Sequence, residues 1–568
     1  MTPLLDRIAD HARLGPGSPA YTFIDFLGGD GEPQVCTWGG LYERSVRLAQ
    51  RLRRFVVPGE RVAILAPTGL EYVLALIASW YAGAIAVPLF APGLPGHAER
   101  LAASFADCDP SAVVTVAACA EAVRAFAGGA TKIIIAGEAA GTADEDTGWR
   151  PGPAEPDDVA YLQYSSGSTR LPAGVEITHR NLTANVDQLV GTLTGGRPHI
   201  TGVNWLPLFH DMGLLASVAV PLRAGTDAVL LDPVAFLMQP ARWLRLLSGR
   251  PDAYTAAPNF AYDYCLRRLE PADLDGLDLS GVFLWLNGAE PVRAATLDRF
   301  AERLTGAGLD RRALCPAYGL AEATVYVAGH GIDRPPRAVA FDRDRLAAGE
   351  AVPAAGAARA SAASSSAASA SAAEQSVLVS CGPPAGQEVA IVDPETGEAL
   401  PAGRVGEIRV RGANVARRYW RREPIAGDDG GWLCTGDLGT LHDGELFVTG
   451  RLKDLLIVAG RNHYPQDVEE TVGEAAPELG RAAAFTVTVD DVDKAVVVAE
   501  RSRAAGEWRP GEIARAVRQA VWRRHDLALH DLVLAEPGTI PRTTSGKVSR
   551  TACRSRYLEE KTMAAQDA

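Results

Sequence analysis

Hydroxyl-bearing residues form a short loop directly after a strand-like run, YLQY, at 161–164. The loop consists of Ser165, Ser166, Gly167, Ser168, Thr169 and Arg170. Successive backbone N–H groups beside a flexible glycine form an anion-binding hollow, and the hydroxyls add further donors. No Gly-Lys-Ser/Thr sequence follows, so the loop is not a P-loop. It could hold the terminal phosphates of a nucleotide, or it could be a plain turn.

Further along the chain, other segments carry side chains that could act on a phosphorylated ligand. They are AYGLAEAT (317–324), GWLCTGDLG (431–439), GRLKDLLIVAGRNHYP (450–465) and PRTTSGKVSR (541–550). Lys547 follows Thr-Ser-Gly, whose small side chains would let the amine reach into a cleft. Glu322 supplies a carboxylate oxygen, which a hard cation on phosphate oxygens needs, and Asp437 supplies a carboxylate that can accept hydrogen bonds. The structural alternatives are a surface lysine, a helix cap at Asp437 and a surface ion pair at Arg451.

Taken in order, these segments resemble the adenylate-forming enzymes, which include acyl-CoA synthetases, peptide-synthetase adenylation domains and luciferase. Within that superfamily the chain is most similar to the fatty acyl-AMP ligases. The segments that carry this second resemblance are NWLPLFHDMGLL (204–215), TAAPNFAYDYC (255–265), WLNGAEPV (285–292), LVSCG (378–382) and GRNHYPQDVE (460–469). The stretch between Gly329 and Val377 falls where those ligases carry an extra insertion.

The resemblance implies a reaction with ATP and Mg²⁺. A fatty acid carboxylate attacks the α-phosphorus, pyrophosphate leaves and an acyl-adenylate forms. The acyl group then passes to the phosphopantetheine thiol of an acyl carrier protein, in polyketide, peptide or lipid biosynthesis. Catalysis of this kind depends mainly on positioning and on stabilising the spreading negative charge.

The resemblance also assigns catalytic roles. Lys547 would bridge the carboxylate and the α-phosphate oxygens, Glu322 would support the magnesium ion, and His210 would lie beside the acyl carboxylate. Lys453 and Asp454 would form the hinge on which a small C-terminal domain swings. We expect the acyl pocket to be lined by residues of 205–217, 232–243 and 256–263.

The nucleotide pocket follows from the same resemblance. Tyr318, next to Gly319, would stack on adenine, and Thr324 would contact the α-phosphate. Asp437 would accept hydrogen bonds from the ribose hydroxyls, and Arg451 would donate to the same sugar. The turn that lines the adenine pocket would consist of Asn287, Gly288, Ala289 and Glu290.

One position departs from the superfamily pattern. Many members have a lysine at the position of Ala173, where it helps to hold the outgoing phosphates. Arg170 could supply that charge, because a guanidinium binds phosphate in a bidentate way. We interpret Ala173 as a mark of the subgroup and not as a loss of activity.

The patterning predicts an α/β protein whose elements would position these residues. Strand-like runs such as RVAILAP (61–67) and TDAVLLD (226–232) alternate with helical segments, which is typical of parallel sheets. After Ser376, strands between Gly-rich turns predict antiparallel strands that form a small β-barrel-like subdomain or sheet. We expect an N-terminal domain over 1–452 and a small, mobile α+β domain over 453–568. An insertion with an Ala/Ser-rich loop, expected to be disordered, would occupy about 329–377.

Composition excludes several functions. The 568 residues carry a net charge of −13, which argues against nucleic-acid binding. The 8 cysteines form no Cys-x-x-Cys pair, so we expect reduced thiols and a cytoplasmic protein. The apolar stretch 74–92 contains Gly83, Pro88 and Pro92, and we interpret it as a buried helix, a turn and a strand instead of a membrane span.

Two other functions stay open. An acyl-CoA ligase would differ only in its acceptor, which would be coenzyme A. The insertion is the feature that discriminates the two functions, because an insertion that braces the small domain against rotation would suppress the coenzyme A reaction. A degenerate nucleotide-binding protein is supported only by Ala173. An amino-acid adenylation domain is disfavoured, because we find no aspartate placed to pair an α-amino group.

Since carrier proteins are usually acidic, a basic face on the C-terminal domain would suit docking of a carrier protein. Its candidates are Arg515, Arg518, Arg523, Arg524, Arg550, Arg554 and Arg556.

Overall fold

The structure is a computed structural model, and it describes most of the chain. The described residues are 4–566 apart from 30, 95–96, 130, 138–148, 150, 153, 165–171, 333, 355–374, 426–429, 459–460, 490–491, 503–507 and 544–546, with side chains described as far as 561. Two predicted features lie outside them: the hydroxyl-rich loop from Ser165 to Arg170, and most of the Ala/Ser-rich tract.

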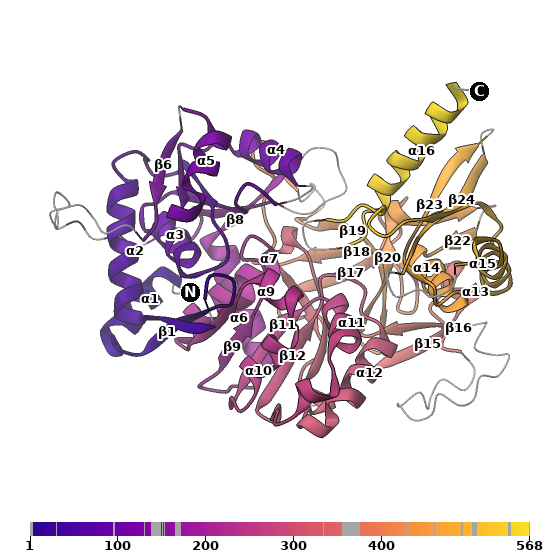
Figure 1. Ribbon diagram of the computed structural model, residues 1–568, viewed down its shortest axis with the longest axis horizontal. Coiled ribbons are helices and arrows are strands. Elements are labelled where there is room, and N and C mark those ends of the chain that lie inside the picture. The colour runs from indigo at the N-terminus through magenta and orange to yellow at the C-terminus, as the bar shows by residue number, and fades with distance from the viewer. Residues whose placement is uncertain are drawn as a thin grey trace.

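An eight-stranded sheet forms the centre of the N-terminal half (Figure 1). Its strands in spatial order are β14 (Tyr326–Gly329), β13 (Leu314–Gly319), β12 (Val282–Asn287), β11 (Ala253–Ala257), β9 (Thr201–Asn204), β10 (Ala228–Leu231), β1 (Pro19–Asp25) and β2 (Glu32–Thr37). Neighbouring strands run parallel except in the two edge pairs. The predicted parallel architecture is confirmed.

A six-stranded sheet lies beside it and is also mainly parallel. Its order is β6 (Lys132–Ile135), β5 (Ala112–Thr115), β3 (Arg61–Leu65), β4 (Ile85–Leu89), β7 (Val159–Tyr164) and β8 (Gly174–Thr178). Only β7 and β8 run antiparallel. β7 and β8, which flank the hydroxyl-rich loop in the sequence, form one edge of this sheet.

Helix α3 (Leu70–Tyr81) packs between the two sheets, and every residue in it except Glu71 is buried. Its polar tips are satisfied by strand carbonyls: Tyr72 donates to Leu89 and Trp80 donates to Ala160, each at 2.9 Å. This helix and β4 account for the apolar stretch 74–92, as predicted. Within the described part of the chain, no helix is both long and apolar enough to cross a bilayer.

The remaining helices of the N-terminal half surround the sheets or pack at their ends. They are α1 (Leu4–Leu14), α2 (Trp38–Leu52), α4 (Ala98–Cys108), α5 (Ala120–Ala127), α6 (His179–Leu193), α7 (Asp211–Leu214), α8 (Val220–Ala224), α9 (Pro233–Met238), α10 (Ala241–Leu247), α11 (Asn259–Arg268) and α12 (Ala294–Leu304). A π-helical turn, Leu215–Ala219, joins α7 to α8.

An antiparallel sheet follows in the chain, as the Gly-rich turns predict. It contains β17 (Glu388–Val392), β18 (Gly406–Arg411), β19 (Leu433–His442) and β20 (Glu445–Arg451). The insertion supplies β15 (Ala338–Asp342), α13 (Arg343–Ala347) and β16 (Gln375–Val379), with β15 and β16 paired antiparallel.

The C-terminal part is an α+β unit, as predicted. Its elements are β21 (Leu456–Val458), β22 (Arg461–His463), α14 (Pro465–Ala475), β23 (Leu479–Val489), β24 (Val492–Arg501), α15 (Pro510–His525), β25 (Leu529–Ala535) and α16 (Arg550–Gln566). β24 pairs antiparallel with β23 and parallel with β25. Figure 1 shows α16 projecting from this unit at the end of the chain.

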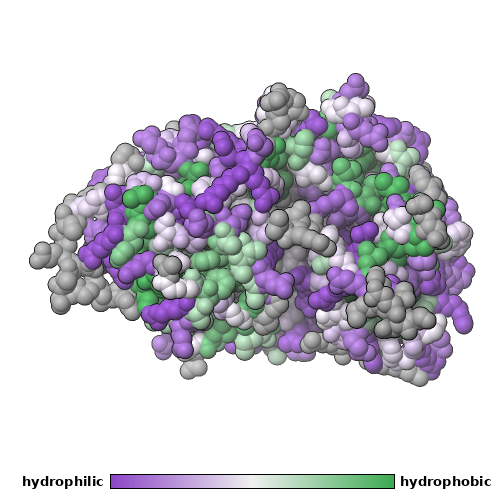
Figure 2. Space-filling view, turned by 90° about the horizontal axis from the view of Figure 1, so that it is seen from above, coloured by the Kyte–Doolittle hydropathy of each residue, from purple (hydrophilic) through white to green (hydrophobic). Residues whose placement is uncertain are grey.

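Seen from above, the molecular surface carries hydrophobic residues as separate clusters between hydrophilic ones (Figure 2).

Polar contacts join the insertion to the C-terminal unit. Arg343 of α13 donates to the carbonyl of Arg524 at 2.8 Å. Arg461 donates to the carboxylate of Asp344 at 2.7 Å. The Ser376 hydroxyl lies 3.1 Å from the Asp467 carboxylate, to which it donates.

Apolar packing supports the same junction. Tyr464 of the C-terminal unit is buried in one cluster with Phe341 and Leu346 of the insertion and Phe447 of β20. Hydrophobic burial and hydrogen bonds therefore hold the insertion against the C-terminal unit in this conformation.

Candidate active site

A cavity of about 780 Å³ opens where the two large sheets, the antiparallel sheet and the C-terminal unit meet. Ligand sites of open α/β folds lie at the carboxyl ends of parallel strands, and β12 and β13 both end at this cavity. The predicted residues that line it are His210, Gly288, Ala289, Tyr318, Gly319, Glu322, Arg451, Lys453 and Lys547, together with Ala173. The fold thus brings together residues that lie far apart in the sequence.

The other described residues of the predicted site are not among the lining residues. They are Asn287, Glu290, Thr324, Asp437 and Asp454. Asn287 is buried at the end of β12, and its amide nitrogen donates to Asn259 at 3.3 Å. Asp454 lies 3.4 Å from Arg550, at the start of the C-terminal unit.

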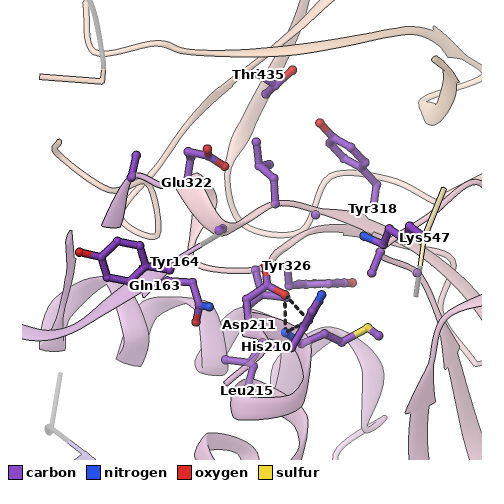
Figure 3. A pocket seen from close by; sticks show the side chains of 18 of the residues that line it. Gln163, Tyr164, His210, Asp211, Leu215, Tyr318, Glu322, Tyr326, Thr435 and Lys547 are labelled. Carbon is purple, nitrogen blue, oxygen red and sulfur yellow. Dashed lines mark hydrogen bonds and ion pairs between the residues drawn. The ribbon is translucent and has the colours of Figure 1, made fainter. Parts of the chain in front are cut away.

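His210 and Asp211 form a close pair on the cavity wall (Figure 3). His210 Nδ1 lies 2.7 Å from Asp211 Oδ1, and the Met212 N–H donates to the same carboxylate oxygen at 2.6 Å. Burial would raise the pKa of Asp211, but His210 and Lys547 hold it below its usual value. The short contact to Asp211 fixes the orientation of the His210 ring, whose Nδ1 also lies 3.3 Å from the Met212 nitrogen.

Lys547 reaches this cavity from the C-terminal unit, in the segment that precedes α16. Figure 3 shows Lys547 and Glu322 at different places on the cavity wall, which Tyr318 also lines. Loss of solvent around the ammonium lowers the pKa of Lys547, and the charges of Asp211 and Glu290 partly oppose this effect. Burial raises the pKa of Glu290, whose carboxylate accepts from the Phe260 N–H at 2.5 Å. Asp211 and Glu290 therefore favour the charged form of Lys547, which is the form that could bind a substrate's negative charge.

Tyr318, Asp437 and Arg451 are linked in one network. The Tyr318 hydroxyl donates to Asp437 Oδ2 at 2.8 Å, and Arg451 Nε donates to Asp437 Oδ1 at 2.9 Å. Asp437 is buried at 5% exposure, while the Arg451 side chain is 49% exposed. Asp437 therefore fixes the tyrosine ring and one face of the arginine, and both of these side chains line the cavity.

Glu322 is held by a residue that the sequence analysis does not single out. The Tyr419 hydroxyl donates to Glu322 Oε1 at 2.7 Å, and both residues line the cavity. The Ala416 N–H donates to the Glu322 carbonyl at 2.8 Å. Both contacts come from the loop between β18 and β19, which therefore orients the carboxylate.

The backbone near Glu322 is unusually tight. Thr324 has φ 66° and ψ −63°, and the Val325 N–H donates to the Ala323 carbonyl at 2.9 Å, which together define a strained γ-turn. A side chain at Gly319 would collide with the Val325 carbonyl, so only glycine fits. The buried Thr324 hydroxyl donates to the Asn414 carbonyl at 2.7 Å.

The cavity lining overlaps only in part with the stretches expected to form the acyl pocket. Of the three expected stretches, only 205–217 contributes lining residues. Other apolar lining residues, such as Leu189, Leu286, Val325 and Tyr326, come from elsewhere in the chain. Within 232–243, Phe236 is buried and stacks on Trp205 with ring centroids 3.9 Å apart.

Two of the arginines predicted to form a docking face are engaged in ion pairs. Arg550 donates to both oxygens of Glu469 at 2.6 and 2.7 Å, and Arg524 pairs with Glu474. The remaining candidates are exposed: Arg515, Arg518, Arg523, Arg554 and Arg556.

Comparison with known proteins identifies the family. The AMP-binding enzyme family matches residues 8–420, and the AMP domain of the Disco-interacting protein 2-like family matches residues 453–567. The long-chain-fatty-acid–AMP ligase FadD26 of Mycobacterium marinum is 40% identical over 98% of each chain. The protein fadD25 of Mycobacterium tuberculosis, named as a fatty-acid–CoA ligase, is 40% identical over 97% of each chain.

Solved structures of similar proteins agree with this family assignment. A chain from structural and functional studies of fatty acyl-adenylate ligases from E. coli and L. pneumophila has a TM-score of 0.87 and 32% identity, over 99% of both chains. A fatty acyl-adenylate ligase from L. pneumophila in complex with acyl adenylate and pyrophosphate has a TM-score of 0.74 and 31% identity, over 98% of this chain and 96% of its own. The chain therefore belongs to the AMP-binding enzyme family, among relatives named as fatty-acid–AMP and fatty-acid–CoA ligases.

Proposed function

We propose that this protein activates a fatty acid with ATP and Mg²⁺ and passes the acyl group to the phosphopantetheine thiol of an acyl carrier protein in the cytoplasm. The observation that carries the proposal is that Lys547 enters one cavity with His210, Tyr318 and Glu322. The acyl-adenylate in the L. pneumophila relative agrees with this reaction.

The chemistry needs charge stabilisation and little proton transfer. An oxygen of the fatty acid carboxylate bonds to the α-phosphorus, and the bond from that phosphorus to the bridging oxygen breaks. Pyrophosphate leaves with the bonding electrons. Lys547 would neutralise the carboxylate and the α-phosphate oxygens as they approach. His210, oriented by Asp211, would place Nε2 beside the carboxylate.

The residues present fit a magnesium ion that arrives with ATP. Across the described part of the chain, no three His, Cys, Asp or Glu side chains form a metal-binding group. Mg²⁺ commonly uses one or two carboxylates together with substrate phosphates and water. Glu322, fixed by Tyr419, would supply that carboxylate, and the bound ion would neutralise phosphate charge.

The nucleotide would lie between the network of Tyr318, Asp437 and Arg451 and the turn at Gly288 and Ala289. The Tyr318 ring would stack on the adenine. The Arg451 guanidinium binds Asp437 through Nε, and its other N–H groups would donate to the ribose. The hydroxyl-rich loop at 165–170 would wrap the phosphates. We retain the boundary between 452 and 453 for the two domains, with Lys453 and Asp454 as the hinge.

The junction between the insertion and the C-terminal unit favours a carrier protein over coenzyme A as the acceptor. A thiol must reach the adenylate after Lys547 has withdrawn, so the junction must open. A ligand can shift such an equilibrium only by its differential affinity for the open state. A carrier protein has a large surface with which to bind the opened form, whereas coenzyme A has a small one.

The degenerate alternative has little support, since the residues expected for catalysis are present and gathered in one cavity. The test is to incubate the protein with ATP, Mg²⁺ and a panel of fatty acids, with amino acids as negative substrates, and to detect acyl-AMP by mass spectrometry. We expect acyl-AMP from medium- or long-chain acids in the wild type and almost none in Lys547→Gln. Wild-type protein that forms no acyl-AMP from any fatty acid would overturn the proposal.

A further inference from the structure

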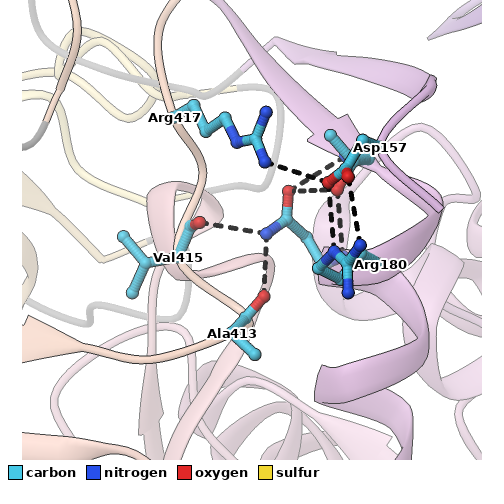
Figure 4. A network of polar contacts seen from close by, with 7 residues as sticks. Asp157, Arg180, Ala413, Val415 and Arg417 are labelled. Carbon is cyan, nitrogen blue, oxygen red and sulfur yellow. Dashed lines mark hydrogen bonds and ion pairs between the residues drawn. The ribbon is translucent and has the colours of Figure 1, made fainter. Parts of the chain in front are cut away.

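The loop between β18 and β19 is rich in arginine and is tied to the six-stranded sheet. Arg417 pairs with Asp157 at 2.9 Å, and Asp157 also binds Arg180 of α6 (Figure 4). The Asn181 amide donates to the Ala413 carbonyl at 2.8 Å. This network fixes the start of the loop at the base of α6.

The middle of the loop is hydrogen-bonded to β8, which directly follows Pro172 and Ala173 of the cavity wall. The Trp420 N–H donates to the Gly174 carbonyl at 2.7 Å. Tyr419 and Arg422, on either side of this contact, both line the cavity. Backbone pairing therefore places these two side chains at the Pro172–Ala173 wall, although they lie far from it in the sequence.

Arg422 differs from its arginine neighbours in what it binds. Carboxylates lie 3.8 Å from Arg418 and 3.3 Å from Arg421. Arg422 donates to the Pro172 carbonyl at 3.1 Å, and none of the described carboxylates forms an ion pair with it. A guanidinium has five N–H donors, so most of those on Arg422 are available to a ligand.

The turn that positions Arg422 requires an unfavourable backbone conformation at Arg421. The Arg422 N–H donates to the Tyr419 carbonyl at 3.0 Å, closing a tight turn, and Arg421 within that turn has φ 55°. This left-handed conformation is unfavourable for arginine. The turn therefore directs two consecutive arginines differently, one to a carboxylate and one to the cavity.

The free donors of Arg422 suit an anionic ligand with several oxygens, because the guanidinium brings a positive charge to a part of the wall where Pro172 and Ala173 bring none. We propose that Arg422 binds the β- and γ-phosphates of ATP and then the departing pyrophosphate, an inference that rests on the adenylation function proposed above. The planar guanidinium suits phosphate because it can donate two parallel hydrogen bonds.

The test compares Arg422→Gln with Arg421→Gln, a matched loss of charge at the neighbouring position outside the cavity. The assay is pyrophosphate–ATP exchange with a fatty acid that the wild type accepts. We expect the KM for pyrophosphate to rise roughly 5- to 10-fold in Arg422→Gln, a range reduced for solvent screening. The KM for the fatty acid should stay within about twofold, as should every constant of Arg421→Gln.

A rescue variant sharpens the test. Adding Ala173→Lys to Arg422→Gln returns one cation to the same wall and should restore most of the pyrophosphate affinity, whereas Ala173→Met should not. An unchanged KM in Arg422→Gln, or an equal rise in Arg421→Gln, would overturn the inference. If Arg422→Gln does not fold, the test compares the KM for pyrophosphate in Arg422→Lys and Arg422→Met. The lysine and methionine side chains are similar in length and differ in charge. Equal KM values for that pair would likewise overturn it.

Failure of the proposed function gives a different result. Wild-type protein would then show no exchange with any fatty acid. Calorimetric titration of pyrophosphate into the wild type and Arg422→Gln would still test the site, and equal affinities would overturn the inference.

Discussion

Removing the Arg343 side chain should loosen the junction between the insertion and the C-terminal unit. Arg343 is half-buried on α13 and donates to the Arg524 carbonyl at 2.8 Å across the junction. A hydrogen bond from a charged donor contributes about 1.5–3 kcal/mol, and partial exposure reduces this to about 1–2 kcal/mol. At 1.36 kcal/mol per tenfold change, Arg343→Ala should raise the open population about 5- to 30-fold.

If opening limits the reaction with coenzyme A, the rate of acyl-CoA formation should rise by the same factor. Acyl-AMP formation should stay within about twofold, because Arg343 does not line the cavity. The matched control is Arg345→Ala on the same helix, since Arg345 pairs with Glu350 inside the insertion and not with the C-terminal unit. Both variants are assayed for acyl-CoA by mass spectrometry.

Hydrogen exchange in α15 reports opening independently of chemistry. Faster exchange in Arg343→Ala without more acyl-CoA would show that the junction does not govern acceptor choice. An equal gain in Arg345→Ala would refute the assignment of the effect to this contact.

Four further predictions concern the cavity. Lys547→Gln should lower kcat for acyl-AMP formation about 10²- to 10³-fold, as loss of a charge-stabilising group does. Because the pKa of Lys547 is lowered, kcat/KM for ATP in the wild type should fall as pH rises, beginning below the usual lysine value of 10.5; a profile flat to that pH would contradict this. Asp437→Asn weakens the contacts of Asp437 with Tyr318 and Arg451, so steady-state kinetics should show the KM for ATP raised roughly 10- to 100-fold, and an unchanged KM would argue against a nucleotide site here. Tyr419→Phe leaves the Glu322 carboxylate without its hydroxyl partner, so a Mg²⁺ titration should show the half-saturating concentration raised about 3- to 10-fold; a shift in KM for fatty acid alone would count against it.

Much of the fold follows from local patterning. The uninterrupted apolar run in α3 predicts a helix buried on all sides, and the structure places it between two sheets. The change from alternating helices and strands to Gly-separated strands correctly predicts the antiparallel sheet. These features depend on hydrophobic periodicity and turn residues, which act over short stretches of chain.

The site is predictable only where a motif marks it. Lys547 and Glu322 stand in marked segments and line the cavity. Tyr419 and Arg422 carry no such mark, because their position depends on pairing with β8, and Arg422 meets a carbonyl 250 residues away. Thr324 lies in a marked segment, yet the strained turn directs its hydroxyl to Asn414, a detail of backbone geometry that residue types do not specify.

The central claim is that the protein makes acyl-AMP for a carrier protein. The most direct measurement is to supply wild-type protein with ATP, Mg²⁺ and an accepted fatty acid in the presence of both coenzyme A and a phosphopantetheinylated carrier protein, and to quantify both acyl thioesters by mass spectrometry. We expect the acylated carrier protein as the main product, with little acyl-CoA. Abundant acyl-CoA with an unloaded carrier protein would contradict it.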